Sequence, residues 1–397
     1  MPYDYSSLLA SEDGVSGTWR EVYDYNLSLP ENVLSIFKKS VYLPYDFYNL
    51  LAVYCLLPSA LCRVLPYLFL YGQSGSGKST TSKLFSYMHG VPVDSSGSSF
   101  AGVRNSLNER RHGWAEVVDE HDKERTWNKP VERNTIMVWD DIDTNVFSKY
   151  PDLYRMFKFG YDRRTDKIII SSEKTGENLE FHCFCPKVFS SISPLHLDDR
   201  FKELKRRLIV IPCRRIEEIS PERRIELGII FDNWQSNLID IDAYNWKGFN
   251  LEFDSFWNYD TASIFVSTRN SISETVRGLN SQQRAISLDL IACGITCGIW
   301  SDAEEAVDEL KTYWQWFKQE TEANAGLEQL LKEYLQQEQK NCEATGNSLQ
   351  VNNKQLRFQI DIWVAEGWLM EKPRISQLPE IMLDLGWRLQ KGIWRKI

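Results

Sequence analysis

The chain has 397 residues, of which 43% are hydrophobic and 13% aromatic, enough to fill the cores of two or three domains. Its 46 basic and 55 acidic side chains give a net charge of −9, which excludes a protein that is basic overall, although a local basic patch could still bind nucleic acid. The eight cysteines lack zinc-site spacing and predict buried thiols in a reducing compartment. No signal peptide is visible, and prolines interrupt the most apolar stretch, so we expect a cytoplasmic protein that does not enter a membrane.

Apolar periodicity divides the chain into four parts. Residues 1–44 are mixed and polar and predict a short helical lead-in. Residues 45–215 alternate short apolar runs with helical patterns, which predicts an α/β core with a parallel sheet. Residues 216–336 are expected to be mostly helical. Residues 349–397 follow a polar linker and predict a small separate domain.

Within the core, four apolar runs have the length and composition of buried strands. These are residues 67–71, 135–139, 188–191 and 208–211. A buried helix is expected over residues 45–63, and a polar hairpin over 163–184 with arms at 167–170 and 179–181.

The segment after the first strand has the pattern of a phosphate-binding loop. It consists of Gly72, Gln73, Ser74, Gly75, Ser76, Gly77, Lys78 and Ser79, with Thr80 opening the next helix. Glycines let successive N–H groups turn toward phosphate oxygens, and the helix directs its positive dipole end to the same place. Lys78 supplies a cation for the β- and γ-phosphates, and the Ser79 hydroxyl can coordinate Mg²⁺. Such loops also occur by chance, but the apolar strand before this one and the amphipathic helix after it favour a nucleotide site.

Two aspartates end the second strand. Asp140 would lie near the Mg²⁺, and Asp141 would polarise the attacking water as the catalytic base. Asp143 is an alternative for either role. Turns also favour aspartate without any catalytic role. Asp119 and Glu120 follow a shorter apolar run and are a weaker alternative.

Two later strands provide further candidates. Ser191, or alternatively Ser190, ends the third strand, where a small polar side chain can orient water beside the γ-phosphate, unless it only begins a Ser/Pro turn. A charged stretch precedes the fourth strand, and a guanidinium there could reach the γ-phosphate of a neighbouring subunit. Arg207 is the first choice, before Arg206 and Arg200, although most charged stretches are solvated helix faces.

With these motifs in this order, the chain resembles the AAA+-related superfamily 3 helicases, and most closely the ATPase modules found beside primases in phages and plasmids. The resemblance covers about residues 49–215 and is carried by 67–80, 136–141, 156–160 and 186–210. It implies ATP hydrolysis with Mg²⁺ in a homo-oligomeric ring, a hexamer, that moves along single-stranded DNA. A primase or another replication protein would be a compatible partner.

Two details of the resemblance concern specific side chains. The polar strand tip is commonly Asn in these helicases, whereas this chain has two serines. The helicases also carry a hairpin whose basic tip tracks single-stranded DNA. Arg163, Arg164, Lys167 and Lys174 match that hairpin by position, or else only keep an exposed hairpin soluble.

The last segment has the pattern of a winged-helix-like domain. A helix is expected over residues 353–366, a strand over 367–370 and a wing-like hairpin over 386–394. Lys354 and Arg357, together with basic residues near Trp387 and Trp394, would suit phosphate contact and base stacking. The alternative is a packing domain whose tryptophans form the core.

These patterns favour an Mg²⁺-dependent, ring-forming DNA helicase or translocase in the replication of a phage, plasmid or mobile element. An ATP-dependent switch or loader that binds a partner protein, without helicase activity, is the alternative, and the acidic pI of about 5.3 favours it slightly. A small-molecule kinase is disfavoured because no acceptor site is evident.

Overall fold

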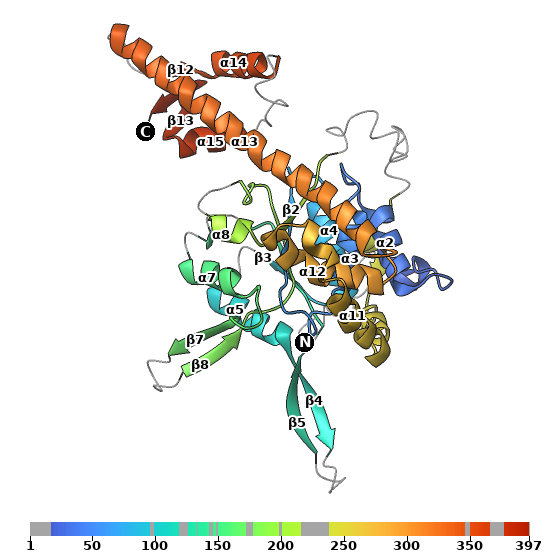
Figure 1. The fold of residues 1–397 in the computed structure, drawn as a ribbon. Helices are drawn as coiled ribbons and strands as arrows, with labels where there is room; N and C mark the ends of the chain where they lie inside the picture. The colour runs from blue at the N-terminus through green and yellow to red at the C-terminus, as the bar shows by residue number, and fades with distance from the viewer. Residues whose placement is uncertain are drawn as a thin grey trace, which may run out of the picture. The chain divides into compact units, whose positions relative to one another are not determined.

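A computed structural model of the chain describes residues 17–95, 99–118, 126–132, 134–142, 146–147, 150–171, 178–197, 201–215, 238–345, 350–365 and 377–396. The chain divides into two compact units, Met1–Lys311 and Thr312–Ile397. Figure 1 labels the helices and strands of both units.

A five-stranded parallel sheet forms the centre of the first unit. Its strands are β2 (Tyr67–Tyr71), β3 (Val93–Ser95), β6 (Met137–Asp140), β9 (Lys187–Ser191) and β10 (Leu208–Pro212), in the spatial order β10-β2-β9-β6-β3. All four neighbouring pairs are parallel. β2 and β10 are buried along their whole length, which explains their uninterrupted apolar sequences. The predicted α/β class with a parallel sheet is confirmed.

Four of the five strands fall where the sequence predicts them, and β3 does not. β3 has three residues and lies at the edge of the sheet beside β6. So short a strand cannot show a periodicity of its own, which explains why it was not predicted. The strand expected from residue 135 begins at Met137.

Three helices of the first unit pack next to one another. α2 (Leu29–Ser40) begins with a capping box between Ser28 and Glu31. α3 (Tyr48–Leu56) is apolar on nearly all sides and is correspondingly buried, although it is shorter than the helix expected over residues 45–63. α4 (Lys78–His89) follows the loop and packs on β6 and β9.

The rest of the first unit is mainly helical. Its further helices are α5 (Phe100–Arg111), α7 (Pro151–Phe159), α8 (Lys202–Lys205), α10 (Asn250–Phe256), α11 (Tyr259–Ser271), α12 (Ser281–Thr296) and the beginning of α13 (Ala303–Thr345). Two-residue strands β1 (Gly17–Thr18) and β11 (Tyr244–Asn245) pair in parallel and join the lead-in to this helical region. The helical content expected for residues 216–336 is confirmed for the described part, which begins at residue 238.

Two antiparallel hairpins are added to the core. β7 (Lys167–Ser171) and β8 (Asn178–His182) form the hairpin that the sequence predicts, with the predicted arms. β4 (His112–Val118) and β5 (Thr126–Glu132) form a longer hairpin, which projects from the first unit in Figure 1. The sequence does not predict the second hairpin, because polar residues and Pro130 interrupt the apolar residues of its arms.

The second unit has a core of its own. A three-stranded antiparallel sheet, in the order β12 (Gln350–Asn352), β14 (Ile393–Lys396) and β13 (Trp387–Gln390), packs with α14 (Asn353–Ala365), α15 (Gln377–Asp384) and the end of α13. The buried residues at its centre are Leu327, Leu331, Leu335, Val351, Leu356, Ile360, Trp363, Leu378, Met382, Trp387 and Trp394. The expected hairpin and the helix from Asn353 are confirmed, whereas the strand expected over residues 367–370 lies outside the described residues.

Burial corrects one expectation for this unit. Trp387 and Trp394 are 3% and 1% exposed, and both lie in the core. They cannot stack on nucleic-acid bases without unfolding the unit, so the packing interpretation of these tryptophans is the right one.

Two further expectations concern burial. Seven of the eight cysteines, those whose side chains the structure describes, are buried and free, as expected. Within the same part of the chain, no helix has both the length and the apolar composition needed to cross a membrane.

Candidate functional site

The loop between β2 and α4 has a backbone that requires its glycines. A Cβ atom at Gly72 would lie 1.9 Å from the carbonyl oxygen of Cys213, on the neighbouring chain segment after β10. Gly75 and Gly77 have φ angles of 78° and 86°, in the left-handed region that other residues rarely adopt. The three glycines therefore let the loop turn back on itself at the end of β2.

The first turn of α4 faces the same place. The helix begins at Lys78 after Gly77, and no side chain caps its amino end. Its first backbone N–H groups are therefore left for an anionic ligand, which the helix dipole also favours. The backbone amides that the sequence predicts for phosphate binding thus lie where the loop joins the end of β2 to the start of α4.

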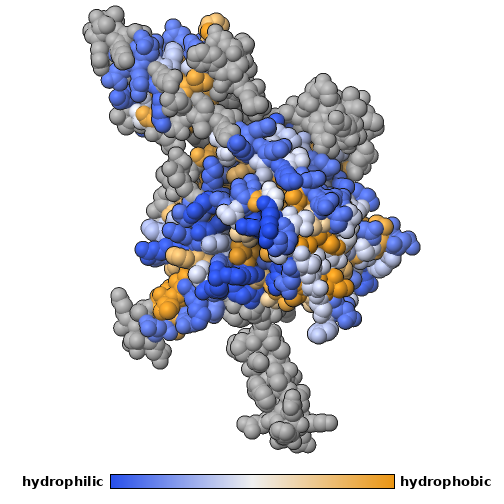
Figure 2. Space-filling model, viewed as in Figure 1, coloured by the Kyte–Doolittle hydropathy of each residue, from blue (hydrophilic) through white to orange (hydrophobic). Residues whose placement is uncertain are grey.

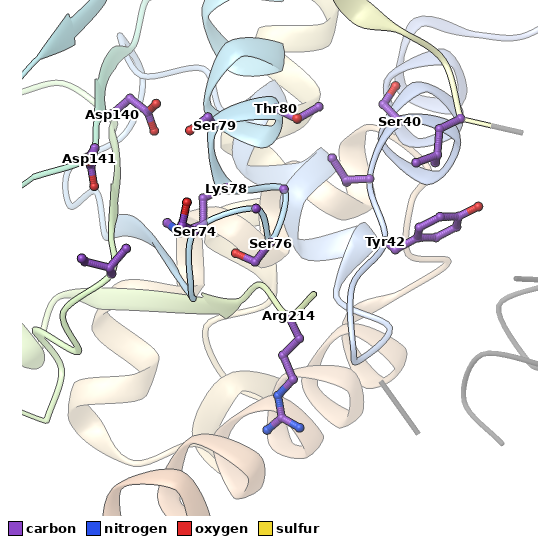
Figure 3. Close-up of a pocket in the computed structure, with 15 residues that line it drawn as sticks. Ser40, Tyr42, Ser74, Ser76, Lys78, Ser79, Thr80, Asp140, Asp141 and Arg214 are labelled. Carbon is purple, nitrogen blue, oxygen red and sulfur yellow. The ribbon is translucent and has the colours of Figure 1, made fainter. Parts of the chain in front are cut away.

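A pocket of about 670 Å³ opens over this loop (Figure 3). It is lined by the loop residues 74–80, by Asp140, Asp141 and Ile192 at the ends of neighbouring strands, and by residues 40–42, Arg214 and Leu238. This volume suits a ligand of the size of a nucleotide. Gly72 and Gln73, which the sequence also assigns to the nucleotide, shape the turn without lining the pocket.

Lys78 is 6% exposed, and its ammonium group stays within the loop. Its Nζ donates to the carbonyl oxygens of Gly72 and Gln73, at 2.6 and 2.8 Å. Burial lowers the pKa of this ammonium, and the nearby carboxylates of Asp140 and Asp141 oppose the shift. The side chain is thus a buried cation at the floor of the pocket, within a loop whose amides can also bind an anion.

Asp140 is the last residue of β6, and Asp141 follows it; both line the pocket across from the loop. Figure 3 shows the Asp140 carboxylate and the Ser79 hydroxyl turned toward each other. A hydroxyl and a carboxylate are hard oxygen ligands of the kind that Mg²⁺ takes from proteins, with the remaining positions left to phosphate and water. The side chain of Asp141 is exposed in the pocket. Asp143, the alternative, lies outside the described residues, as do Asp119 and Glu120.

The serines at the end of β9 have different partners. Ser190 Oγ donates to Asp140 Oδ1 at 2.5 Å, and it accepts the backbone N–H of Asp141 at 2.8 Å. Ser191 Oγ donates to the carbonyl oxygen of Ile142 at 2.7 Å. The structure therefore brings Ser190, the second choice, to the acidic residues. Ser191, the first choice, contacts backbone and does not line the pocket.

Two of the candidate arginines lie just before the amino end of β10, whereas the pocket lies at the carboxyl ends of the strands. Arg207 precedes β10 and is 8% exposed, with its guanidinium 4.1 Å from the centre of the Tyr161 ring and 3.7 Å from Glu203 Oε2. The side chain of Arg206 is 53% exposed and bonds to Glu203. Arg206 is thus the accessible guanidinium of the pair, although Arg207 was the first choice. Arg200 lies outside the described residues.

Two arginines that the sequence interpretation missed flank the loop. Arg214 lines the pocket, and Figure 3 shows its guanidinium directed away from Lys78. Arg215 donates from Nε to the carbonyl oxygen of Ser74 at 2.6 Å. Both follow β10, and the carboxyl ends of parallel strands meet at one edge of a sheet. That rule, applied to the strand over residues 208–211, could have found them.

The basic residues proposed for the hairpin β7–β8 are mostly engaged elsewhere. Arg163 donates to the carbonyl oxygens of Cys62 and Ser59, and Arg164 bonds to Asp162 at 2.7 Å. Lys167 pairs with Glu180 at 2.8 Å. Arg163 and Arg164 precede the hairpin, so their expected place on it is wrong. Lys174 lies outside the described residues.

The hairpin β13–β14 of the second unit carries a different set of basic residues. Its exposed cations are Arg388, Lys391, Arg395 and Lys396, and no acidic residue lies between residues 385 and 397. Lys354, at the start of α14, is also exposed, whereas Arg357 is half-buried. Arg388 and Arg395 are directly opposite each other on the two strands. Like charges at such positions destabilise a hairpin, and an anionic ligand would relieve that repulsion.

The fit of a metal can be judged from the donor set. In the described part of the chain, no group of three or more His, Cys, Asp and Glu side chains is arranged to hold a metal ion. Mg²⁺ bound through a nucleotide needs only one or two protein oxygens. Ser79 and Asp140 meet that requirement.

No protein-family model matches the chain, and no curated protein matches it.

Proposed function

We propose that the chain is an Mg²⁺-dependent ATP hydrolase with an AAA+-like P-loop core, which acts as a superfamily 3-like DNA helicase or translocase. The observation that carries the proposal is the pocket in which loop residues 74–80 face Asp140 and Asp141. Phosphate-binding amides, a buried lysine, a hydroxyl and two carboxylates around one nucleotide-sized space are the groups that phosphoryl transfer to water requires.

Each group has a distinct task in this mechanism. The loop amides and the first turn of α4 would bind the phosphates, and Lys78 would exchange its bonds to the loop carbonyls for a γ-phosphate oxygen. Ser79 and Asp140 would hold Mg²⁺, which when bound neutralises charge on the phosphates. Asp141, exposed in the pocket beside Asp140, would orient the attacking water and accept its proton.

The strand order supports an ATPase of this kind. β9 lies between β2, which precedes the loop, and β6, which carries the aspartates. The inserted strand separates the carboxylates from the loop by the width of one strand. The resulting space beyond the loop suits a water molecule that attacks the γ-phosphate.

The experiment is ATP hydrolysis by wild-type protein and Lys78→Ala. We expect the variant to lose hydrolysis by about 100-fold or more, because a positioned charge on the transferred phosphoryl group supplies much of the transition-state stabilisation. Lys83→Ala is the matched control, since Lys83 lies on the same helix but pairs with Asp242 at the surface. Equal activity of Lys78→Ala and Lys83→Ala would overturn the proposal.

A protein-binding switch or loader is the second candidate, and one observation favours it. The hairpin β7–β8 exposes Ile169 and Leu179, at 58% and 48%, and Figure 2 shows apolar residues gathered there. Its Lys167 is neutralised by Glu180. Such arms suit contact with a protein better than contact with DNA. Stimulation of hydrolysis by single-stranded DNA would favour the helicase, and stimulation by a protein alone would favour the switch.

A further inference from the structure

The ends of β6 and β9 are joined by four hydrogen bonds. Two come from Ser190 Oγ, which donates to Asp140 Oδ1 and accepts the N–H of Asp141. The third runs from the N–H of Ile142 to the carbonyl oxygen of Ser190 at 2.7 Å, and the fourth from Ser191 Oγ to the carbonyl oxygen of Ile142 at 2.7 Å. We call these two serines, Ser190 and Ser191, the serine clip.

The direction of these bonds determines what each serine does. A backbone N–H can only donate, so the Ser190 oxygen must accept from Asp141. The one proton of that hydroxyl is then directed to Asp140 Oδ1, where the hydrogen bond fixes the orientation of the carboxylate. Oδ2 of Asp140 is left for other ligands. Ser191 Oγ does not bond to the carboxylates: it donates to the backbone of Ile142 beyond them and accepts the N–H of Ser193 at 3.1 Å.

The clip also maintains an uncommon backbone conformation. Asp141 has φ = 53°, in the left-handed region, which for a residue other than glycine costs about 1 kcal/mol or more and persists only where neighbours hold it. The bonds to the N–H of Asp141 and to both polar groups of Ile142 hold it. This conformation turns the chain directly after Asp140 and leaves the Asp141 side chain exposed to the pocket.

Neither serine can meet the nucleotide itself. Ser190 is 0% and Ser191 1% exposed, and neither lines the pocket. A strand-tip side chain that senses water at the γ-phosphate would have to reach the pocket. Here the tip instead contacts the acidic residues.

We propose that the serine clip positions the acidic pair: Ser190 orients Asp140 toward Mg²⁺, and Ser191 holds the turn that presents Asp141 to water. Both are positioning residues, because they act through the aspartates. The inference rests on the proposed ATPase function and assigns separate tasks to two adjacent serines. Loss of Ser190 should therefore weaken use of the metal, and loss of Ser191 should slow the chemical step.

The experiment compares Ser190→Ala with its neighbour Ser191→Ala, in the full chain, by steady-state hydrolysis at varied Mg²⁺. Ser190→Ala should raise the Mg²⁺ concentration for half-maximal rate by about 10-fold, the usual effect of removing a partner that orients a metal ligand. Ser191→Ala should leave that concentration within about 2-fold and lower kcat by about 10-fold, because Asp141 loses its orientation. Ser190→Cys, which keeps a weak donor of similar size, should fall between wild type and Ser190→Ala.

Two controls separate positioning from general damage. Nucleotide binding in EDTA should be unchanged in each variant, because the loop meets the clip only through the backbone, where the N–H of Gly72 donates to the carbonyl oxygen of Ser191, and the substitutions keep that carbonyl. In an Asp140→Asn background, Ser190→Ala should have no further effect on the Mg²⁺ dependence. The first substitution already removes the carboxylate that Ser190 orients, so the two effects should not add. If Ser190→Ala does not fold, Ser190→Cys and Ser191→Ala still supply the comparison.

The outcomes are distinct. Equal Mg²⁺ dependence in wild type, Ser190→Ala and Ser190→Cys overturns the clip while leaving the ATPase intact. A wild-type protein that binds nucleotide but does not hydrolyse it contradicts the proposed function instead. The clip is then tested by the affinity for Mn²⁺ with a non-hydrolysable ATP analogue, which Ser190→Ala should lower by about 10-fold and Ser191→Ala should not. Equal Mn²⁺ affinities would overturn it.

Discussion

At the residue scale, the histidine that ends α4 shows how burial links the pocket helix to pH. His89 Nε2 lies 2.9 Å from the carbonyl oxygen of Cys55, and its ring stacks on Phe253 with 4.7 Å between the ring centres. Burial lowers the pKa of His89 to about 4, and the bond to the Cys55 carbonyl only partly opposes this. The imidazole is therefore neutral in the folded protein at neutral pH, with Nε2 as the donor.

This shift predicts a loss of stability in mild acid. The unfolded chain binds a proton at His89 near pH 6.5, whereas the folded chain does so only near pH 4, so the free energy of unfolding falls as the pH drops between these values. Between pH 7 and pH 5 the loss should be about 2 kcal/mol. His89→Gln keeps a donor for Cys55 but cannot titrate.

The measurement is urea unfolding of wild type and His89→Gln at both pH values. Other groups titrate equally in the two proteins, so the difference between them isolates His89. We expect the variant to lose less stability on acidification than wild type does. Identical losses in both proteins would show that His89 takes up its proton as readily in the folded protein as in the unfolded chain.

At the element scale, the hairpin β13–β14 is a rigid carrier of positive charge. Lys391 and Gly392 have φ angles of 49° and 79°, as in the tight two-residue turns that match the twist of a hairpin. Gly392 accepts the N–H of Asn353, which ties the turn to the start of α14 near Lys354. In a chain with a net charge of −9, such a basic surface is where we expect the phosphates of a nucleic acid to bind.

Charge reversal tests this surface. Arg388→Glu with Arg395→Glu should weaken binding of single-stranded DNA by about 10-fold or more and lower the slope of log affinity against log salt by about one to two. Arg277→Glu with Lys311→Glu is the matched control, because it changes the net charge equally at exposed ion pairs of the first unit. Fluorescence anisotropy over a range of salt gives both quantities. Equal effects of the two double variants would mean that only net charge matters.

Elements that are marked by their own residues can be predicted from the sequence. The loop at residues 72–79 and the strands around it have glycines and apolar runs that need no knowledge of neighbours. β3 has only three residues, and polar residues and Pro130 interrupt the apolar residues of β4 and β5, so neither shows a clear periodicity. Local patterns thus predict four strands of the sheet, including the edge strand β10, but not the edge strand β3.

The choice between Ser190 and Ser191 fails for a related reason. Side chains alternate between the two faces of a strand, and a one-residue shift exchanges those faces. β9 is buried on both faces, so no alternation of apolar and polar residues marks which serine contacts the Asp140 carboxylate. The same limit applies to Arg206 and Arg207, since burial of Arg207 on Tyr161 comes from a distant part of the chain.

At the scale of the whole molecule, the parallel sheet separates the pocket from the arginine pair. β2 and β10 are in register, Tyr67 with Leu208 and Tyr71 with Pro212. The loop follows the carboxyl end of β2, and Arg206 and Arg207 precede the amino end of β10. Five residues of strand span about 16 Å. Neither guanidinium can reach the pocket of its own chain, so a role in hydrolysis requires a second copy.

That geometry makes the proposed ring testable by complementation. Arg206→Ala keeps its own pocket, and Lys78→Ala keeps its arginines, so each alone should be inactive in a ring whose sites are shared between neighbours. Mixed and reassembled in equal amounts, about a quarter of the sites should combine an intact pocket with an intact arginine and recover hydrolysis. Light scattering with a non-hydrolysable ATP analogue and single-stranded DNA should show the oligomer itself.

The result distinguishes three arrangements. Recovery of activity on mixing places Arg206 at a neighbour's pocket. A second outcome is an oligomer in which Arg206→Ala is inactive and mixing restores no activity. Arg206 would then have no role at a neighbour's pocket. The same mixing design should then be repeated with Arg207→Lys, which keeps a cation over Tyr161. A protein that stays monomeric with nucleotide and DNA present would contradict the ring. Because Arg206 and Arg207 lie a strand length from their own pocket, it would also remove both from the mechanism, leaving Arg214 and Arg215, at the carboxyl end of β10, as the arginines beside the phosphates.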